Sequence, residues 1–272
     1  MYTLNCKGRL LVVDKPLVMG IINATPDSFY EGSRFMGEDG ILQQAEKMLK
    51  AGADILDIGG QSTRPNSEAI SAEEELQRVT GAIESLHFNF PEAIISIDTY
   101  YSQVAKAAVE AGASLVNDIS GGQVDMFETV AALNVPYVLT HIKGTPANML
   151  QQARYENVTR EVLDYFIEKT AACRAAGIRD IIIDPGFGFA KTHAHNFTLL
   201  KNLSAFSILD MPILAGISRK STIYKTLDIT AAEALNGTTV LNTIALMHGA
   251  HMLRVHDVKE AKEAITLVSK MP

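Results

Sequence analysis

The chain has 272 residues, of which 47% are hydrophobic, so it is long enough to bury a large core. Its formal net charge is −7 and its lysines and arginines are spread out, so it lacks the basic patch typical of nucleic-acid binding. The start MYTLNCKGRL lacks the apolar core of a signal peptide, and no apolar run approaches the length of a membrane span. Cys6 and Cys173 have no metal-ligand spacing and indicate a reducing compartment. We therefore expect a soluble, cytoplasmic globular protein.

The first predicted element is a β-hairpin in LNCKGRLLVV, with Lys7-Gly8 near its turn. Eight strands are predicted after it, because eight apolar runs follow. Near-continuous hydrophobicity is typical of parallel strands that are buried on both faces. Four of the runs are 17–23, 93–99, 136–142 and 212–218, and the other four lie within 51–60, 111–120, 175–186 and 248–257.

Amphipathic helices are predicted between the strands. In 39–51 the apolar residues form one stripe, and around 158–175 Val158, Val162, Phe166 and Ile167 share a side. Eight strands that alternate with helices predict a (β/α)8 TIM barrel of the α/β class, with the hairpin at its bottom. We expect one domain over residues 1–272. A doubly wound open sheet is the alternative.

Nearly every predicted strand ends in a polar residue. Active sites of (β/α)8 barrels lie at the C-terminal ends of the strands, so these residues are candidates for function. A single Asp or Asn at such a place often caps the next loop, and we expect Asp57 and Asp118 to be structural in this way. The strand-end residues are Asn23, Asp57, Asp98, Asn117, Asp118, His141, Asp184, Ser218, Arg219, Lys220, Arg254 and His256.

These side chains divide into two chemical groups. Asp98, Asn117 and Asp184 offer the acceptors and mixed edges that recognise a flat heterocycle with several N–H groups. The second group can carry positive charge on an acidic chain, and such clusters hold phosphate or pyrophosphate. Its members are Arg64, Lys220, Arg254 and His256. We therefore expect a site with a ring-binding half and an anion-binding half.

A set of motifs at the strand ends carries a family resemblance. The motifs are GIINATPDSF (20–29), DIGGQSTRP (57–65), ISIDT (95–99), VNDIS (116–120), IDPGFGF (183–189), GISRK (216–220) and RVHDV (254–258). In this order they resemble the dihydropteroate synthases of the pterin-binding family over essentially the whole chain. The resemblance implies an Mg²⁺-assisted transferase of folate synthesis. Such enzymes join 6-hydroxymethyl-7,8-dihydropterin diphosphate to para-aminobenzoate, giving 7,8-dihydropteroate and pyrophosphate. They are commonly homodimers, and sulfonamides compete for the aminobenzoate site.

The resemblance also implies roles for single residues. Asp184 accepts two neighbouring N–H donors of the pterin, and Asn117 and Asp98 contact the rest of its edge. Asp98 also stabilises positive charge that develops as pyrophosphate leaves. Lys220 lies between the pterin and the aminobenzoate pocket. Asn23 is implied as the Mg²⁺ ligand, and a neutral oxygen suits an ion that takes its other ligands from water and phosphate.

The other implied substrate-binding residues are Thr63, Arg64, Pro65, Phe189, Ser218, Arg219, Arg254 and His256. The resemblance then implies that the polar loop GGQSTRPN (59–66) binds substrate. The alternative interpretation is a mobile surface loop without a role in binding. We expect Asp98, Lys220, Arg254 and His256 to act in catalysis. No general base is assigned, because a neutral arylamine is already nucleophilic.

Four positions depart from the family pattern. Gln61 replaces glutamate, and Thr140 replaces a methionine that packs on the pterin. Asn66 and Ala190 replace glycines. Two rival functions stay open: a methyltetrahydrofolate methyltransferase, which has no use for a pyrophosphate site, and a non-catalytic pterin-binding paralogue. An unrelated phosphate-binding barrel is a third, but its glycine-rich phosphate loop is missing.

Overall fold

The computed structural model describes residues 1–24, 38–61, 70–123, 125–144, 149 and 151–271. It begins with the antiparallel hairpin β1 (Tyr2–Cys6) and β2 (Arg9–Val13). Lys7 and Gly8 form the turn with φ values of 52° and 87°. Positive φ at both central residues gives a two-residue turn whose twist matches that of the strands. The predicted hairpin and its turn are confirmed.

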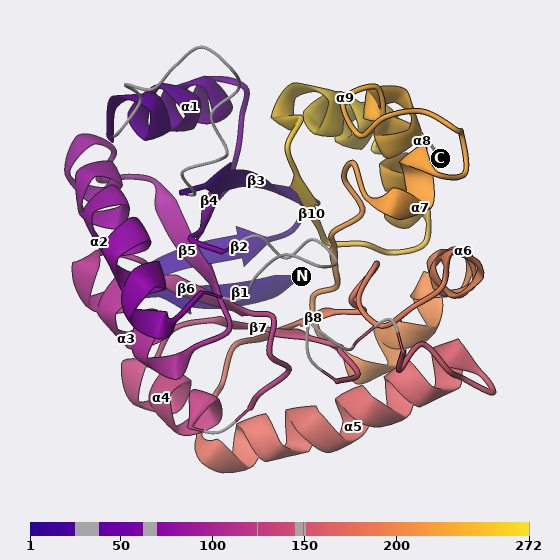
Figure 1. The fold of residues 1–272 in the computed structure, drawn as a ribbon, viewed down its shortest axis with the longest axis horizontal. Coiled ribbons are helices and arrows are strands. Elements are labelled where there is room, and N and C mark those ends of the chain that lie inside the picture. Colours follow the sequence, from indigo (N-terminus) through magenta and orange to yellow (C-terminus); the bar gives the residue numbers. More distant parts are fainter. Residues whose placement is uncertain (25–37, 62–69, 124, 145–148, 150, 272) are drawn as a thin grey trace.

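Eight parallel strands form the main sheet, in the spatial order β8-β7-β6-β5-β4-β3-β10-β9. A parallel bridge between Ile183 of β8 and Ile213, just before β9, brings the two ends of this order together. The predicted barrel is therefore confirmed in place of the open sheet, and Figure 1 shows its ring of strands. The strands are β3 (Leu17–Asn23), β4 (Ile55–Gly59), β5 (Ile94–Thr99), β6 (Leu115–Asp118), β7 (Tyr137–Thr140), β8 (Ile181–Asp184), β9 (Leu214–Ala215) and β10 (Met252–Val255).

Helices surround the barrel (Figure 1). They are α1 (Glu38–Lys50), α2 (Ala72–Asn89), α3 (Ser102–Ala111), α4 (Met126–Leu133), α5 (Val158–Ala176), α6 (His193–Lys201), α7 (Ser221–Tyr224), α8 (Leu235–Met247) and α9 (Val258–Val268), with a 3₁₀ segment at Leu203–Leu209. In α5 the i, i+4 series Val158, Val162 and Phe166 is buried. Ile167 is 54% exposed, so its predicted place on the buried side is wrong. One residue beyond Phe166 lies about 100° further around the helix.

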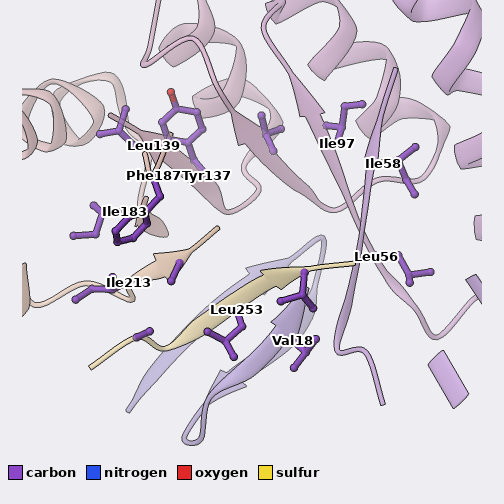
Figure 2. Packing of buried hydrophobic residues seen from close by; sticks show 14 of the residues in the cluster. Val18, Leu56, Ile58, Ile97, Tyr137, Leu139, Ile183, Phe187, Ile213 and Leu253 are labelled. Atoms are coloured by element: carbon purple, nitrogen blue, oxygen red, sulfur yellow. The ribbon is translucent and has the colours of Figure 1, made fainter. Parts of the chain in front are cut away.

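Two apolar layers stabilise the barrel, because successive side chains of a strand point to opposite faces. The outer layer packs the strands against the helices (Figure 2). The inner layer fills the barrel from below and includes Leu4, Cys6 and Val13 of the hairpin. Its strand members are Leu17, Met19, Ile55, Ile94, Leu115, Val138, Ile182, Leu214 and Met252. The hairpin therefore closes the bottom of the barrel.

The same alternation sets what lies at the top of the barrel. Two residues beyond an inner-layer residue, the next side chain on each strand points inward again. For seven of the eight strands these positions are polar or glycine: Asp57, Ser96, Asn117, Thr140, Asp184, Gly216 and Arg254. We call the space they surround, together with Asp98 and Lys220, the mouth. In the described part of the chain, no helix is long and apolar enough to cross a membrane.

Candidate active site

Arg254 lies at the centre of the mouth between two carboxylates. Its Nε donates to Asp57 Oδ2 at 2.6 Å, and a terminal guanidinium nitrogen donates to Asp98 Oδ2. Asn117 Nδ2 donates to the same oxygen of Asp57 at 3.1 Å. Burial acts to lower the pKa of Arg254, but Asp98 and Asp57 outweigh it and raise that pKa above its ordinary value. Arg254 is therefore a fixed positive charge with a defined orientation.

The two aspartates expected to be structural behave differently. Asp118 accepts hydrogen bonds from the backbone N–H groups of Ser120 and Gly122, so it caps the loop after β6 as predicted. Asp57 is different, because its side chain bonds to Arg254 and Asn117 inside the barrel. Asp57 thus belongs to the mouth.

Asp98 is the second-last residue of β5 and lies beside Asn117, its register partner on β6. Burial raises the pKa of Asp98 to about 7, with Arg254 opposing that rise. Oδ2 binds Arg254, whereas Oδ1 has no hydrogen-bond partner among the described residues. A buried acceptor without a partner is costly, so Oδ1 is suited to a donor supplied from outside the chain.

Asp184 is held by the turn that follows β8. Its Oδ1 accepts from Gly186 N at 2.8 Å. A Cβ added at Gly216 would lie 3.6 Å from Asp184 Oδ2, so the absence of a side chain at Gly216 leaves space there. Burial raises the pKa of Asp184, and Lys220 opposes the rise. The second carboxylate oxygen therefore faces the interior of the mouth.

Lys220 reaches across the same turn. Its Nζ donates to Phe187 O at 2.5 Å and lies 4.8 Å from the centroid of the Phe189 ring. Burial lowers the pKa of Lys220 to about 8. Phe189 is 7% exposed and belongs to a small apolar cluster at the barrel top with Ile119, Ile142, Met149 and Ala190. Lys220 and Phe189 thus form one wall of the mouth.

Ser218 and His256 follow the neighbouring strands β9 and β10 and meet at the top of the barrel. Ser218 Oγ lies 3.0 Å from His256 Nδ1 and accepts from His256 N at 3.2 Å. Arg219 is engaged elsewhere, because its guanidinium donates to both oxygens of Asp257 at 2.8 and 2.9 Å. It also donates to the carbonyl groups of Ala231 and Ala232. Substrate binding by Arg219 stays a prediction.

The predicted loop residues Thr63, Arg64 and Pro65 lie outside the described residues. Asn23, the predicted Mg²⁺ ligand, ends β3 with an exposed side chain and pairs in register with Gly59. No group of three or more His, Cys, Asp or Glu side chains in the described ranges could hold a metal ion. The single neutral oxygen of Asn23 fits Mg²⁺, because Mg²⁺ usually keeps several waters and takes its other ligands from substrate phosphate rather than from several protein groups.

Sequence reasoning missed one buried residue near the site, Lys191. Its Nζ lies within 3.0 Å of three polar atoms, on His141, Gly186 and Phe189. A lysine in a glycine-rich segment gives no periodic signal of burial. Its only sequence signal is its position two residues after the motif IDPGFGF.

Comparisons with known proteins agree with this geometry. A family model described as pterin binding enzyme matches residues 19–256. The dihydropteroate synthase of Escherichia coli K12 is 42% identical over 265 residues, which cover 96% of this chain and 94% of that relative.

Solved structures are similar over nearly the whole chain. The dihydropteroate synthase of Yersinia pestis with a sulfonamide drug has a TM-score of 0.93 and 39% identity, covering 98% of each chain. The dihydropteroate synthase of Xanthomonas albilineans in complex with 7,8-dihydropteroate has a TM-score of 0.90 and 37% identity, covering 100% of each chain. Both similarities extend over the barrel and its mouth.

Proposed function

The chain belongs to the pterin-binding enzyme family and has dihydropteroate synthase activity, and on that premise we propose how its mouth carries out the reaction. The enzyme condenses 6-hydroxymethyl-7,8-dihydropterin diphosphate with para-aminobenzoate to 7,8-dihydropteroate and pyrophosphate. The rival methyltransferase needs no pyrophosphate site. The non-catalytic paralogue is the alternative that the experiment below tests.

The pterin lies against Asp184, Asn117 and Asp98. One observation carries this assignment: the three side chains lie at the C-terminal ends of β5, β6 and β8 and point into the barrel, and their hydrogen bonds within the protein leave acceptor oxygens unused. Gly186 N donates to one carboxylate oxygen of Asp184, and Arg254 donates to one carboxylate oxygen of Asp98. The oxygens left over suit the N–H donors of a pterin edge, since a carboxylate accepts two such donors.

Asp98 stabilises the transition state. The methylene C–O bond breaks, and its electron pair leaves with pyrophosphate, so positive charge develops on the pterin methylene. A preorganised carboxylate in a water-poor site stabilises such charge strongly. The arylamine nitrogen then forms the C–N bond and releases one proton, which the departing pyrophosphate accepts. Arg254 keeps Asp98 oriented, and Lys220 lies between the two substrates.

The anion-binding half consists of Arg64, Lys220, Arg254 and His256, with Thr63 beside Arg64 in the loop. Pro65 stiffens that loop beside the aminobenzoate, and Ser218 lies near the aminobenzoate carboxylate. Arg254 contributes long-range positive charge to it, because its N–H groups toward Asp57 and Asp98 are already used. Phe189 forms the aminobenzoate wall, and Arg219 supports Ser218 and Lys220 from the turn after β9. Asn23 would hold Mg²⁺, which when bound neutralises charge on the diphosphate.

The assembly and the location of the enzyme are also proposals. We propose that residues 1–272 form one domain and that two copies associate as a homodimer. Leu227, Val240 and Met247, on and before α8, are between 49% and 59% exposed, which suits an interface. Two free, buried cysteines suit the reducing cytoplasm. Analytical ultracentrifugation tests the dimer.

A coupled assay tests the function. Purified protein is mixed with the dihydropterin diphosphate and Mg²⁺, with and without para-aminobenzoate, and pyrophosphate and pteroate are followed together. We expect equal release of both, and only with aminobenzoate. Binding of the pterin without formation of pteroate would instead indicate the non-catalytic paralogue. Asp98→Asn is the matched variant, and it should lower kcat by at least about 100-fold.

A further inference from the structure

Lys191 is a buried lysine that contacts the turn after β8. The residue is 4% exposed, and its Nζ lies 2.8 Å from His141 Nδ1 and 3.0 Å from the carbonyl oxygens of Gly186 and Phe189. An ammonium group has three N–H donors, so three partners satisfy it completely. Burying an amine without hydrogen-bond partners would cost free energy of folding.

The pairing of Lys191 with His141 tolerates either protonation state. Burial lowers the pKa of His141, and Lys191 lowers it further, so the imidazole is neutral. Nδ1 of a neutral imidazole accepts from an ammonium group. If Lys191 is neutral instead, its nitrogen accepts from Nδ1–H and still donates to both carbonyl groups. The three contacts therefore persist in both states.

The turn that Lys191 binds needs to be held in place. Gly186, Gly188 and Ala190 have φ values of 71°, 82° and 49°, in the left-handed region that is unfavourable for alanine. Lys191 bonds to two carbonyl groups on this turn, at its first glycine and at Phe189. Its third contact, to His141 directly after β7, joins the turn to the end of the neighbouring strand.

The same turn orients two groups of the mouth. Gly186 N holds Asp184 Oδ1 at 2.8 Å, and Phe187 O holds Lys220 Nζ. A shift of Gly186 would therefore rotate the carboxylate of Asp184. We propose that Lys191 is a positioning residue, which fixes the turn after β8 so that Asp184 presents its second oxygen to the pterin. This inference rests on the pterin site proposed above.

A double-mutant cycle tests the inference. Isothermal titration with 6-hydroxymethyl-7,8-dihydropterin diphosphate gives the Kd of the wild type, Lys191→Met, Asp184→Asn and the double variant. We expect Lys191→Met to weaken binding about 10-fold and Asp184→Asn about 100-fold. The double variant should bind no more weakly than Asp184→Asn alone, because Lys191 acts through Asp184. Lys262→Met, far from the mouth on α9, is the control and should bind like the wild type.

The outcomes separate this inference from the pterin site itself. If Lys191→Met binds like the wild type while Asp184→Asn loses affinity, Lys191 has no positioning role. If the two losses multiply in the double variant, Lys191 does not act through Asp184, and the inference is again wrong. If neither variant loses affinity, the proposed pterin site is wrong.

A second variant keeps the test open if Lys191→Met does not fold. Lys191→Gln is one atom shorter, so its amide does not reach both carbonyl groups. We expect about a threefold loss of affinity, and no further loss in the Asp184→Asn background. Wild-type affinity of Lys191→Gln would overturn the positioning role.

Discussion

Gly216 shows how a single missing side chain keeps the mouth open. A Cβ at this position would lie 3.6 Å from Asp184 Oδ2, 3.8 Å from Lys220 Nζ and 3.9 Å from Arg254 Cβ. These are ordinary van der Waals distances, and Gly216 is not among the residues with positive φ. Gly186 differs, because a Cβ there would overlap the carbonyl oxygen of His141. The two glycines are therefore needed for different reasons.

We predict that Gly216→Ala folds normally but binds the pterin poorly. The new methyl group occupies space between the three charged side chains, so affinity for the dihydropterin diphosphate should fall at least about 10-fold. The free energy of unfolding should change by less than about 1 kcal/mol. Calorimetric titration and urea unfolding measure the two quantities. Unchanged affinity would place the pterin elsewhere.

Arg254 combines stability and function in one side chain. Arg254→Met leaves Asp57 and Asp98 buried without their cation, and breaking a buried pair in this way costs about 3–5 kcal/mol. We therefore expect a large loss of unfolding free energy together with loss of activity. Arg254→Lys keeps the positive charge but loses the planar guanidinium group that binds two carboxylates. Its unfolding free energy should therefore lie between those of the wild type and Arg254→Met. Urea unfolding of the wild type and the two variants measures this difference. Equal stability of the three proteins would show that Arg254 does not stabilise the buried aspartates.

At the scale of elements, Glu75 joins α2 to β5. Its side chain is fully buried, and Oε2 accepts from the hydroxyl of Thr99 at 3.1 Å. Burial raises the pKa of Glu75 to about 7, with Thr99 opposing the rise. Because the folded protein holds this proton more tightly than the unfolded chain, the contribution of Glu75 to stability is present below pH 4.5 and is lost as the pH rises through 7.

Glu75→Gln should remove this pH dependence. Between pH 5 and pH 8 the variant should gain about 1–3 kcal/mol of unfolding free energy relative to the wild type. Glu84→Gln, an exposed site on the same helix, is the matched control and should show no such gain. Thermal and urea unfolding across this pH range provide the measurement. A constant difference between variant and wild type would mean that Glu75 does not titrate there.

Across the whole molecule, stability and chemistry lie at opposite ends of the barrel. The hairpin closes the bottom with Leu4, Cys6 and Val13, whereas the charged groups gather at the top. Residues at the bottom of such barrels contribute to stability, and those at the top contribute to catalysis.

Leu4→Ala separates the two ends experimentally. Leu4 is 2% exposed, so the cavity should cost about 2–4 kcal/mol of unfolding free energy. The kcat and both KM values should stay within about twofold of the wild type at a temperature where the variant is folded. Leu10→Ala on the same hairpin, where the side chain is 66% exposed, should change stability by less than about 0.5 kcal/mol. A fall in kcat for Leu4→Ala would show that the ends are coupled.

The sequence by itself determined the elements and the composition of the mouth. Apolar runs of strand length and stripes of helical period depend only on neighbouring residues, so they predict β3 and the buried series Val158, Val162 and Phe166 of α5 directly. The β9 strand is the exception. Seven residues, 212–218, were predicted, but only Leu214–Ala215 form the strand, and Ile213 adds an isolated bridge to Ile183.

Only the tertiary structure decided which polar residues face one another. Arg254 and Asp57 lie 197 positions apart in the chain, and Arg254 and Asp98 lie 156 apart. A strand-end aspartate that caps a loop, like Asp118, and one that binds a distant arginine, like Asp57, have the same local pattern. Lys191 likewise has no local signal of burial. Such pairings depend on closure of the barrel, which brings distant strand ends together in space.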